Sequence, residues 1–190
     1  GVYDEGWRVL REQRLETAIA LGIIPDDTSM VSMSSTEDWD SLSAEEKKFQ
    51  SKRMAVYAAM IEAMDYHLGR LILHLREIGE YENTIFIFTS DNGSEASGSR
   101  ANAGSLLKMA QALQGYSTDY ETLGLKGSFN SIGPSFASAA ASPLAYYKFY
   151  SGEGGMRVPL IIAGESISPE QSKTNAFSFV TDLTPTILEL

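Results

Sequence analysis

A carboxylate and an amide stand side by side at Asp91 and Asn92, separated by only two residues from an apolar run at residues 85–88. Their side-chain oxygens are hard donors that suit Ca²⁺ or Mg²⁺, whereas zinc prefers nitrogen and sulfur. The following Gly93 also makes "DNG" a tight-turn signal, but a hairpin needs a second apolar strand and "SEASGSRANAG" supplies none. The residues alone therefore leave two readings open, a cation site and a turn or cap. Two ligands do not complete such a site, because a hard cation takes about six or more oxygens.

Long helical patterns alternate with short apolar runs along the chain. A capping-box pattern at Ser43 and Glu46 opens a helix that we expect to reach Ile78, with an apolar stripe that packs one face on a core. Helices are also predicted at about residues 3–21, within a Ser/Gly/Ala-rich loop at about 106–113, and from Thr181 or Asp182 onward. The rest of the stretch 93–143 is predicted to be a long, poorly structured loop.

Two apolar runs are predicted to be strands. The run "TIFIF" ends just before Asp91, and a second run at residues 158–163 follows a predicted glycine turn at Gly154 and Gly155. Apolar runs without alternation are typical of strands covered on both faces, as in parallel sheets flanked by helices. Ligands of such sheets bind at the carboxyl ends of the strands, which is where Asp91 stands. We therefore expect an α/β fold.

Composition narrows the functional classes. The chain has 190 residues, 43% of them hydrophobic, which is enough for a sizeable core in one domain or a large part of one. A formal net charge of -10 repels a phosphate backbone, so we expect no nucleic-acid partner. The absence of cysteine excludes disulfides and a cysteine nucleophile within this chain. No apolar run approaches the roughly 20 residues of a membrane span. The absence of cysteine also leaves the redox compartment undecided.

Three blocks of the chain follow one another with a characteristic spacing: "VYAAMIEAMDYHLGRLILHLREIGEYENTIFIFTSDNG", "SPLAYYKFYSGEGGMRVPLII" and "TDLTPTILEL". In order and spacing they resemble the second half of bacterial arylsulfatases, which belong to the formylglycine-dependent sulfatase family of the alkaline-phosphatase-like superfamily. The resemblance implies the bacterial periplasm or cytoplasm as the compartment. The resemblance covers essentially the whole chain. It implies that residues 1–190 are a partial sulfatase catalytic domain, a fragment of a mixed, mostly parallel sheet flanked by helices.

The resemblance also implies roles for individual residues. Asp91 and Asn92 correspond to ligands of the active-site cation, usually Ca²⁺ with Mg²⁺ possible, and Lys148 to a lysine that contacts the sulfate group of a small sulfate ester. From the sequence alone, Lys148 in "YYKFY" reads equally well as a surface lysine. A lysine ammonium is a compact point charge with several donors, which suits a tetrahedral anion.

Other residues that could do chemistry are assigned structural roles. The pair Asp26-Asp27 follows a proline rather than a strand and is predicted to form a turn. His67 and His74 lie about 10.5 Å apart along a helix, too far to share one ion, and are predicted to be packing or surface residues. Arg157 could reach a pocket, but a structural bond to the glycine turn is the preferred interpretation.

Parts of the family pattern are missing. The motif that yields the formylglycine nucleophile, the first Asp-Asp metal pair, and the His and Lys that assist the leaving group lie upstream in the family, so we expect a truncated sequence. The resulting hypothesis is that the complete protein hydrolyses sulfate esters and that this chain alone does not. The alternatives are a phosphonate monoester or phosphodiester hydrolase of the same superfamily and a catalytically inactive binding homologue.

Overall fold

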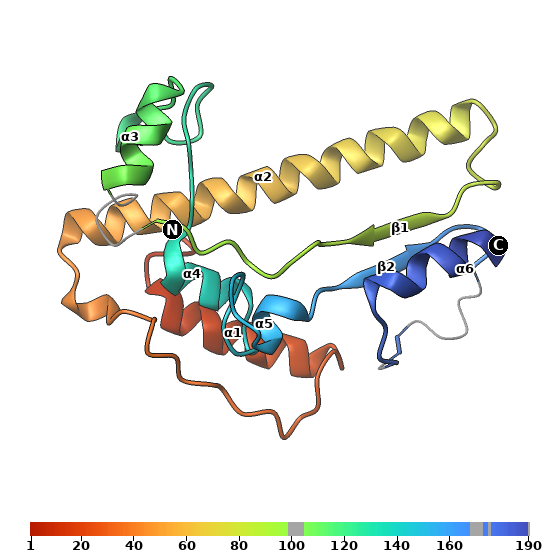
Figure 1. The fold of residues 1–190 in the computed structure, drawn as a ribbon, viewed down its shortest axis with the longest axis horizontal. Coiled ribbons are helices and arrows are strands. Elements are labelled where there is room, and N and C mark those ends of the chain that lie inside the picture. Colours follow the sequence, from red (N-terminus) through yellow and green to blue (C-terminus); the bar gives the residue numbers. More distant parts are fainter. Residues whose placement is uncertain (99–104, 168–172, 175, 190) are drawn as a thin grey trace.

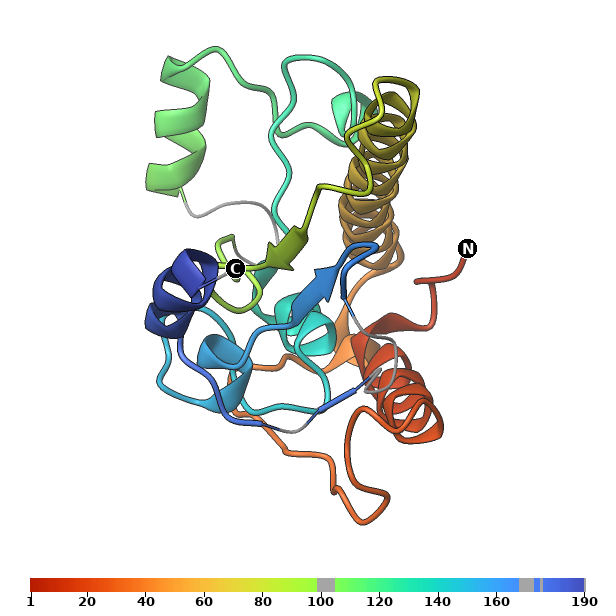
Figure 2. The same cartoon turned by 90° about the vertical axis from the view of Figure 1, so that its right-hand side faces the viewer.

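The chain folds into a helical core from which a small sheet extends, as a computed structural model shows for residues 1–98, 105–167, 173–174 and 176–189 (Figure 1). The elements, in chain order, are α1 Gly6–Ala20, η1 Trp39–Ser41, α2 Ala44–Glu77, β1 Phe86–Thr89, α3 Ser105–Leu113, η2 Tyr120–Thr122, α4 Gly133–Ala140, α5 Glu153–Met156, β2 Leu160–Ala163, η3 Val180–Asp182 and α6 Leu183–Glu189. Two perpendicular views place the sheet between α2 and α6 (Figures 1 and 2).

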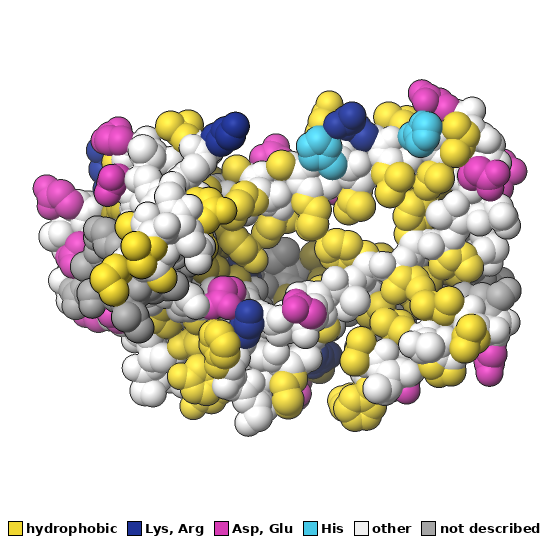
Figure 3. All heavy atoms as spheres, turned by 45° about the horizontal axis from the view of Figure 1, so that its top comes forward, with side chains coloured by type: hydrophobic (Ala, Val, Ile, Leu, Met, Phe, Trp, Pro, Cys, Tyr) yellow, Lys and Arg dark blue, Asp and Glu magenta, His cyan; other side chains and the backbone are white. Residues whose placement is uncertain are grey.

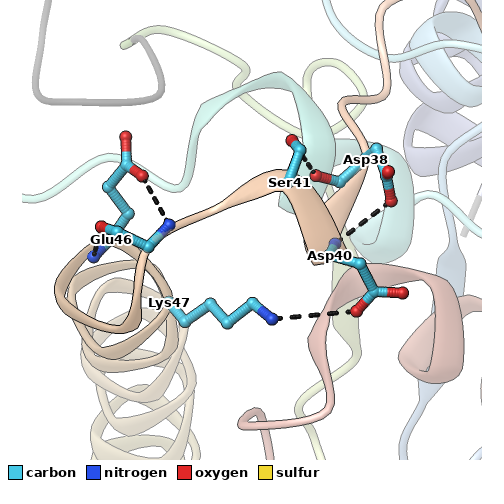
Figure 4. Close-up of polar contacts among 6 residues, drawn as sticks. Asp38, Asp40, Ser41, Glu46 and Lys47 are labelled. Carbon is cyan, nitrogen blue, oxygen red and sulfur yellow. Dashed lines mark hydrogen bonds and ion pairs between the residues drawn. The ribbon is translucent and has the colours of Figure 1, made fainter.

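The start of α2 confirms the predicted capping box. The Glu46 N–H donates to Ser43 Oγ at 3.2 Å, and the Ser43 N–H donates to Glu46 Oε2 at 2.8 Å. Two otherwise unpaired N–H groups of the helix end are thereby satisfied. The Lys47 ammonium lies 3.8 Å from Asp40 and links the first turn of α2 to η1 (Figure 4). The beginning of the long helix is therefore capped by its own residues and linked to η1 at the surface.

The core forms where α1, η1, α4 and the first turns of α2 meet. Trp7 of α1 meets the rings of Trp39 and Phe136 edge-on, with centroids 4.7 and 5.4 Å apart. Edge-to-face contacts of this kind add to the burial of large apolar surfaces. The other buried members of the cluster are Leu10, Leu42, Met54, Ile132, Ala137, Ala139 and Tyr147.

The stretch 93–143 is more ordered than expected. The short helix predicted at about 106–113 is confirmed as α3, whereas residues 99–104 lie outside the described residues. The prediction of a poorly structured loop is wrong at α4, where Phe136 is fully buried. The small residues of "GPSFASAA" give no broad apolar stripe, although Pro134 in the first turn is a helix-start signal.

The mixture of helices and strands fits the expected α/β fold. The two strands pair antiparallel, so the parallel arrangement suggested by their apolar runs is wrong for this pair, whereas the expected mixed, mostly parallel sheet is not tested by two strands. Phe86 pairs with Ala163, and Thr89 pairs with Leu160. Burial on both faces is also wrong here, because all of β2 is exposed and Ile161 is 54% exposed. An unbroken apolar run predicts a strand but does not encode its direction, since side chains alternate between faces in both kinds of sheet.

The apolar stripe of α2 reaches the core only near the start of the helix. Arg53 and Met54 are buried, whereas Met60, Met64 and Leu71 are exposed, so the prediction that the whole stripe packs on a core is wrong in this structure. Apolar side chains along the far half of the helix are visible on the surface (Figure 3). Among the described residues, no helix has the length and apolar character needed to cross a membrane.

The ends of the last elements follow the expected local chemistry. The predicted glycine turn is a short helix, α5, whose Gly154 and Gly155 are buried. Asp182 immediately precedes α6, as expected of a helix start, and its Oδ2 accepts a hydrogen bond of 2.8 Å from the Phe179 N–H. Pro185 lies in the first turn of α6, where its missing N–H is harmless.

Candidate active site

Antiparallel pairing brings the segment that follows β1 beside the segment that precedes β2. Thr89, the last residue of β1, pairs with Leu160, the first residue of β2, and the Thr89 hydroxyl donates to the Pro159 carbonyl at 2.9 Å. The chain that leaves β1 carries Asp91 and Asn92, and the chain that approaches β2 carries Lys148. In a parallel pair these two segments would lie at opposite ends of the strands.

Backbone hydrogen bonds join the two segments. The Gly93 N–H donates to the Gly155 carbonyl at 2.9 Å, and the Lys148 N–H donates to the Ser94 carbonyl at 3.0 Å. The backbones approach so closely that a Cβ on Gly93 would lie 1.8 Å from the Gly154 carbonyl oxygen. Only glycine fits at such an approach. The predicted glycine turn therefore packs directly against the Asp91-Asn92-Gly93 turn.

Lys148 is held by its chain neighbours. Tyr147 belongs to the hydrophobic core and is 3% exposed, so it anchors the segment. Tyr146 and Phe149 adopt φ values of 65° and 80°, in the left-handed region that non-glycine residues rarely occupy. Strained backbone of this kind persists only where the surroundings enforce it, and it gathers at functional sites.

Glu95 pairs with Lys148, a partner that the sequence did not reveal. The Lys148 Nζ lies 2.9 Å from Glu95 Oε2, and the other carboxylate oxygen of Glu95 accepts hydrogen bonds from the Ser97 N–H at 2.7 Å and from the Ser97 hydroxyl. A carboxylate four residues after Asp91 matches no metal or catalytic spacing, so no sequence signal singled it out.

Both members of this pair are charged at neutral pH. The hydrogen bond from Lys148 to Glu95 raises the pKa of Lys148, and the negative charges of Glu95 and, to a smaller extent, Asp91 act in the same direction. Burial acts to raise the pKa of Glu95, but the hydrogen bonds from Ser97 and Lys148 outweigh it and lower that pKa. The Asp91 carboxylate thus lies close enough to Lys148 to act on its charge.

Asp91 and Asn92 lie in a bend that opens toward solvent. Asp91 is exposed and Asn92 is half-buried, and the Ser90 hydroxyl closes the bend by donating to the Asn92 carbonyl at 2.7 Å. Their side chains offer hard oxygens, and within the part of the chain that the structure describes no group of three or more acidic, His or Cys side chains could hold a metal ion. The structure brings Asp91, Asn92 and Lys148 into one loop cluster; their roles as metal ligands and sulfate contact stay predictions.

The residues assigned structural roles take part in local contacts. Asp26 and Asp27 lie in a turn closed by a bond of 3.2 Å from the Thr28 N–H to the Pro25 carbonyl. The remaining three make side-chain contacts: His67 Nδ1 with Arg70 at 3.0 Å, His74 with Glu77 at 3.9 Å, and Arg157 with Glu153 at 3.9 Å.

Comparison with known proteins identifies relatives of this chain. A family model described as Sulfatase matches residues 26–190. The chain is 41% identical over its full length to an uncharacterized sulfatase of Schizosaccharomyces pombe, covering 34% of that protein. It is 33% identical over its full length to an arylsulfatase of Klebsiella aerogenes, covering 40% of that protein.

A shorter match involves an N-acetylglucosamine-6-O-sulfatase of Bacteroides thetaiotaomicron, 48% identical over 40 residues, which are 21% of this chain and 7% of that protein. The chain thus spans between a third and two fifths of the length of the two relatives that it matches throughout. These two come from a yeast and a bacterium, so a bacterial origin is not confirmed. The family resemblance itself is confirmed by the matched family model and by both long alignments, and the chain belongs to the sulfatase family.

Proposed function

We propose that this chain forms one side of the active site of an enzyme that hydrolyses sulfate esters, with Asp91 and Asn92 as cation ligands and Lys148 as a sulfate contact. One observation supports the proposal most directly: in a chain of the sulfatase family, the loop after β1 contacts the segment before β2. The Lys148 N–H donates to the carbonyl of Ser94, which lies two residues after Asn92. A hard-oxygen pair and a lysine then share one solvent-facing cluster. Small sulfate esters are the proposed substrates.

The donor set suits a hard divalent cation. The Asp91 carboxylate and the Asn92 amide oxygen would be two of the ligands of Ca²⁺, or of Mg²⁺, and the remaining oxygens would come from substrate, water and other residues. When bound, such a cation would withdraw negative charge from the sulfuryl oxygens as a Lewis acid. Asp91 supplies the one full negative charge of the pair, so it carries the larger share of cation affinity.

Lys148 supplies a positive charge where a sulfate ester would gain negative charge during hydrolysis. Its ammonium has three donors and is protonated at neutral pH, and the hydrogen bond to Glu95 raises its pKa further above neutrality. A charge placed beforehand where negative charge develops is among the largest contributions to catalysis. The net charge of -10 does not oppose this role, because local charges decide the potential within a site.

The complete reaction would need groups beyond these three. We propose that a formylglycine serves as the nucleophile of the whole protein, and that the 190-residue chain alone does not turn over a sulfate ester. Incubation of the purified chain with an aryl sulfate and Ca²⁺ would check the second part. Release of the phenol at a rate above that of a heat-denatured sample would contradict it.

Three single variants of the complete natural protein test the site. We expect Asp91→Ala to weaken Ca²⁺ binding more than about 10-fold, and Asn92→Ala to weaken it less, because it removes a neutral ligand. We expect Lys148→Ala to lower kcat/KM for 4-nitrophenyl sulfate by about 10²-fold, as for the loss of one transition-state donor, and to leave Ca²⁺ affinity intact. Calorimetry and steady-state kinetics provide the two measurements.

Asp26→Ala is the matched control, because it removes a carboxylate that lies in a turn. If Asp91→Ala and Asn92→Ala behaved like Asp26→Ala in both measurements, the cation site would be refuted. Activity of the complete protein on bis(4-nitrophenyl) phosphate and not on the aryl sulfate would instead favour the phosphodiesterase alternative. Activity on neither substrate would favour an inactive homologue that only binds its ligand.

A further inference from the structure

We infer that Glu95 is a positioning residue that fixes the direction of the Lys148 ammonium. The inference rests on the proposed function of Lys148 as a sulfate contact. It starts from the ion pair of 2.9 Å between Lys148 Nζ and Glu95 Oε2, which joins the loop after β1 to the segment before β2. Glu95 itself belongs to neither the proposed ligand pair nor the lysine segment.

Both side chains of the ion pair are partly exposed, so the pair affects the direction of the Lys148 ammonium more than the stability of the fold. The side chains of Lys148 and Glu95 are 35% and 43% exposed. Ion pairs at this level of exposure contribute little to the free energy of folding. A lysine stem has four rotatable bonds, so without a partner its ammonium would sample a wide volume. The pair therefore matters mainly for where the charge lies.

Glu95 is held from both sides. One carboxylate oxygen accepts hydrogen bonds from the backbone N–H and the hydroxyl of Ser97, which leaves the other oxygen for Lys148. The backbone bond of 3.0 Å from the Lys148 N–H to the Ser94 carbonyl holds the two segments at a constant separation. The carboxylate is thus a preorganised acceptor, and the lysine head adopts the direction that it dictates.

An exposed aromatic ring beside the paired ammonium shows what Glu95 would prevent. The Lys148 Nζ lies 5.3 Å from the centroid of the Phe149 ring, within the range of a cation–π contact. The Phe149 side chain is 76% exposed, so a lysine released from Glu95 could follow it into solvent. With one of its three donors on Glu95, Lys148 keeps two donors for an anion.

The test is a double-mutant cycle in the complete natural protein, with 4-nitrophenyl sulfate as substrate. We expect Glu95→Ala to lower kcat/KM about 10-fold, mostly through kcat, because a misplaced charge loses transition-state stabilisation more than ground-state binding. Glu95→Gln should retain at least about a third of the activity, since the amide oxygen still accepts from the lysine. In the Lys148→Ala background, Glu95→Ala should cost less than about twofold more, because a residue that acts through Lys148 has nothing left to position.

Two further readouts separate positioning from a general structural role. Ca²⁺ affinity of Glu95→Ala should stay within about twofold of the wild type, whereas a collapsed loop would also weaken the site at Asp91. Glu153→Ala removes a neighbouring carboxylate that is paired with Arg157, and it controls for the change in net charge. Glu95→Ala should exceed this control in its effect on kcat.

The outcomes distinguish the inference from the function on which it rests. If Lys148→Ala lowers activity while Glu95→Ala does not, or if the two losses multiply in the double variant, the positioning role is refuted and the sulfate contact stands. If Lys148→Ala itself has no effect, both are refuted. A loss of Ca²⁺ affinity in Glu95→Ala and Glu95→Gln alike would assign Glu95 to loop structure instead.

Discussion

At the residue scale, the loop cluster around Asp91 and Lys148 depends on a residue without a side chain, Gly93. Gly93 lies against Gly154 so closely that any Cβ would overlap the carbonyl oxygen, and this position has no left-handed φ to explain the glycine otherwise. The contact sets the separation between the Asp91-Asn92 bend and the lysine segment. Steric overlap with backbone is costly because backbone cannot rotate away as a side chain can.

Gly93→Ala is therefore expected to destabilise the chain by about 2 kcal/mol or more, the upper range for overpacking. Gly69→Ala is the matched control, because Gly69 lies within α2 and a Cβ added there would meet nothing within 4 Å. Alanine is the better helix former, so this control should gain about 0.5–1 kcal/mol. Urea unfolding followed by circular dichroism measures both. Equal stability of the two variants would show that the close approach is relaxed at no cost.

The residues of the candidate site differ in how far the sequence could reveal them. Asp91 and Asn92 are singled out by their chemistry and by their position after a strand, and Lys148 only by the family resemblance. Glu95 was missed because an ion pair across loops depends on where distant segments meet. The long stretch of chain between Glu95 and Lys148 leaves no local pattern to detect.

At the scale of elements, Arg53 connects α2 to the segment that leads into α4. Its guanidinium donates to the Ser131 carbonyl, to the Ser131 hydroxyl at 3.0 Å and to the Gln50 side chain at 3.1 Å. In return, the Asn130 side chain donates to the Arg53 carbonyl at 2.9 Å. Burial lowers the pKa of Arg53 to about 10, which still leaves the side chain charged at neutral pH.

A lysine cannot reproduce this planar set of donors, so Arg53→Lys should lower the free energy of unfolding by about 2–4 kcal/mol through unsatisfied groups around a buried charge. Arg70→Lys, on the exposed part of the same helix, is the control and should change stability by less than about 0.5 kcal/mol. Chemical denaturation of the two variants provides the comparison. A loss of similar size in both would place the role of Arg53 in helix propensity instead of in the contact with Ser131.

Element type was easier to predict than element direction. The long helix α2, the helix α1 and both strands follow from periodicity, capping and apolar runs, which are local properties. The antiparallel pairing of β1 with β2 was not predictable, because direction depends on the path of the chain between them. The same pairing corrects the argument for the site: Asp91 does follow a strand, but Lys148 reaches it because the neighbouring strand runs the other way.

At the scale of the whole molecule, a large apolar surface remains exposed. It includes the outer half of α2, with Met60, Met64 and Leu71, as well as Ile161 of β2 and Leu188 of α6. Side chains of this kind gather along α2 and near the sheet in the space-filling view (Figure 3). Contiguous apolar surface beyond a few hundred Å² is uncommon on monomeric proteins and marks a surface that associates.

We therefore expect the isolated 190-residue chain to self-associate at micromolar concentration, as light scattering after size exclusion would show. The net charge of -10 opposes association, but at about 0.15 M salt this repulsion is screened beyond roughly 8 Å, so apolar contact should prevail and strengthen with added salt. The double variant Met64→Glu with Leu71→Glu places two charges on the exposed stripe of α2 and should shift the chain toward monomer. His67→Glu with His74→Glu adds the same charge at polar positions of that helix and should shift it less. If the two double variants dissociated equally, net charge and not the apolar stripe would govern association, because the variants differ only in which side chains they replace.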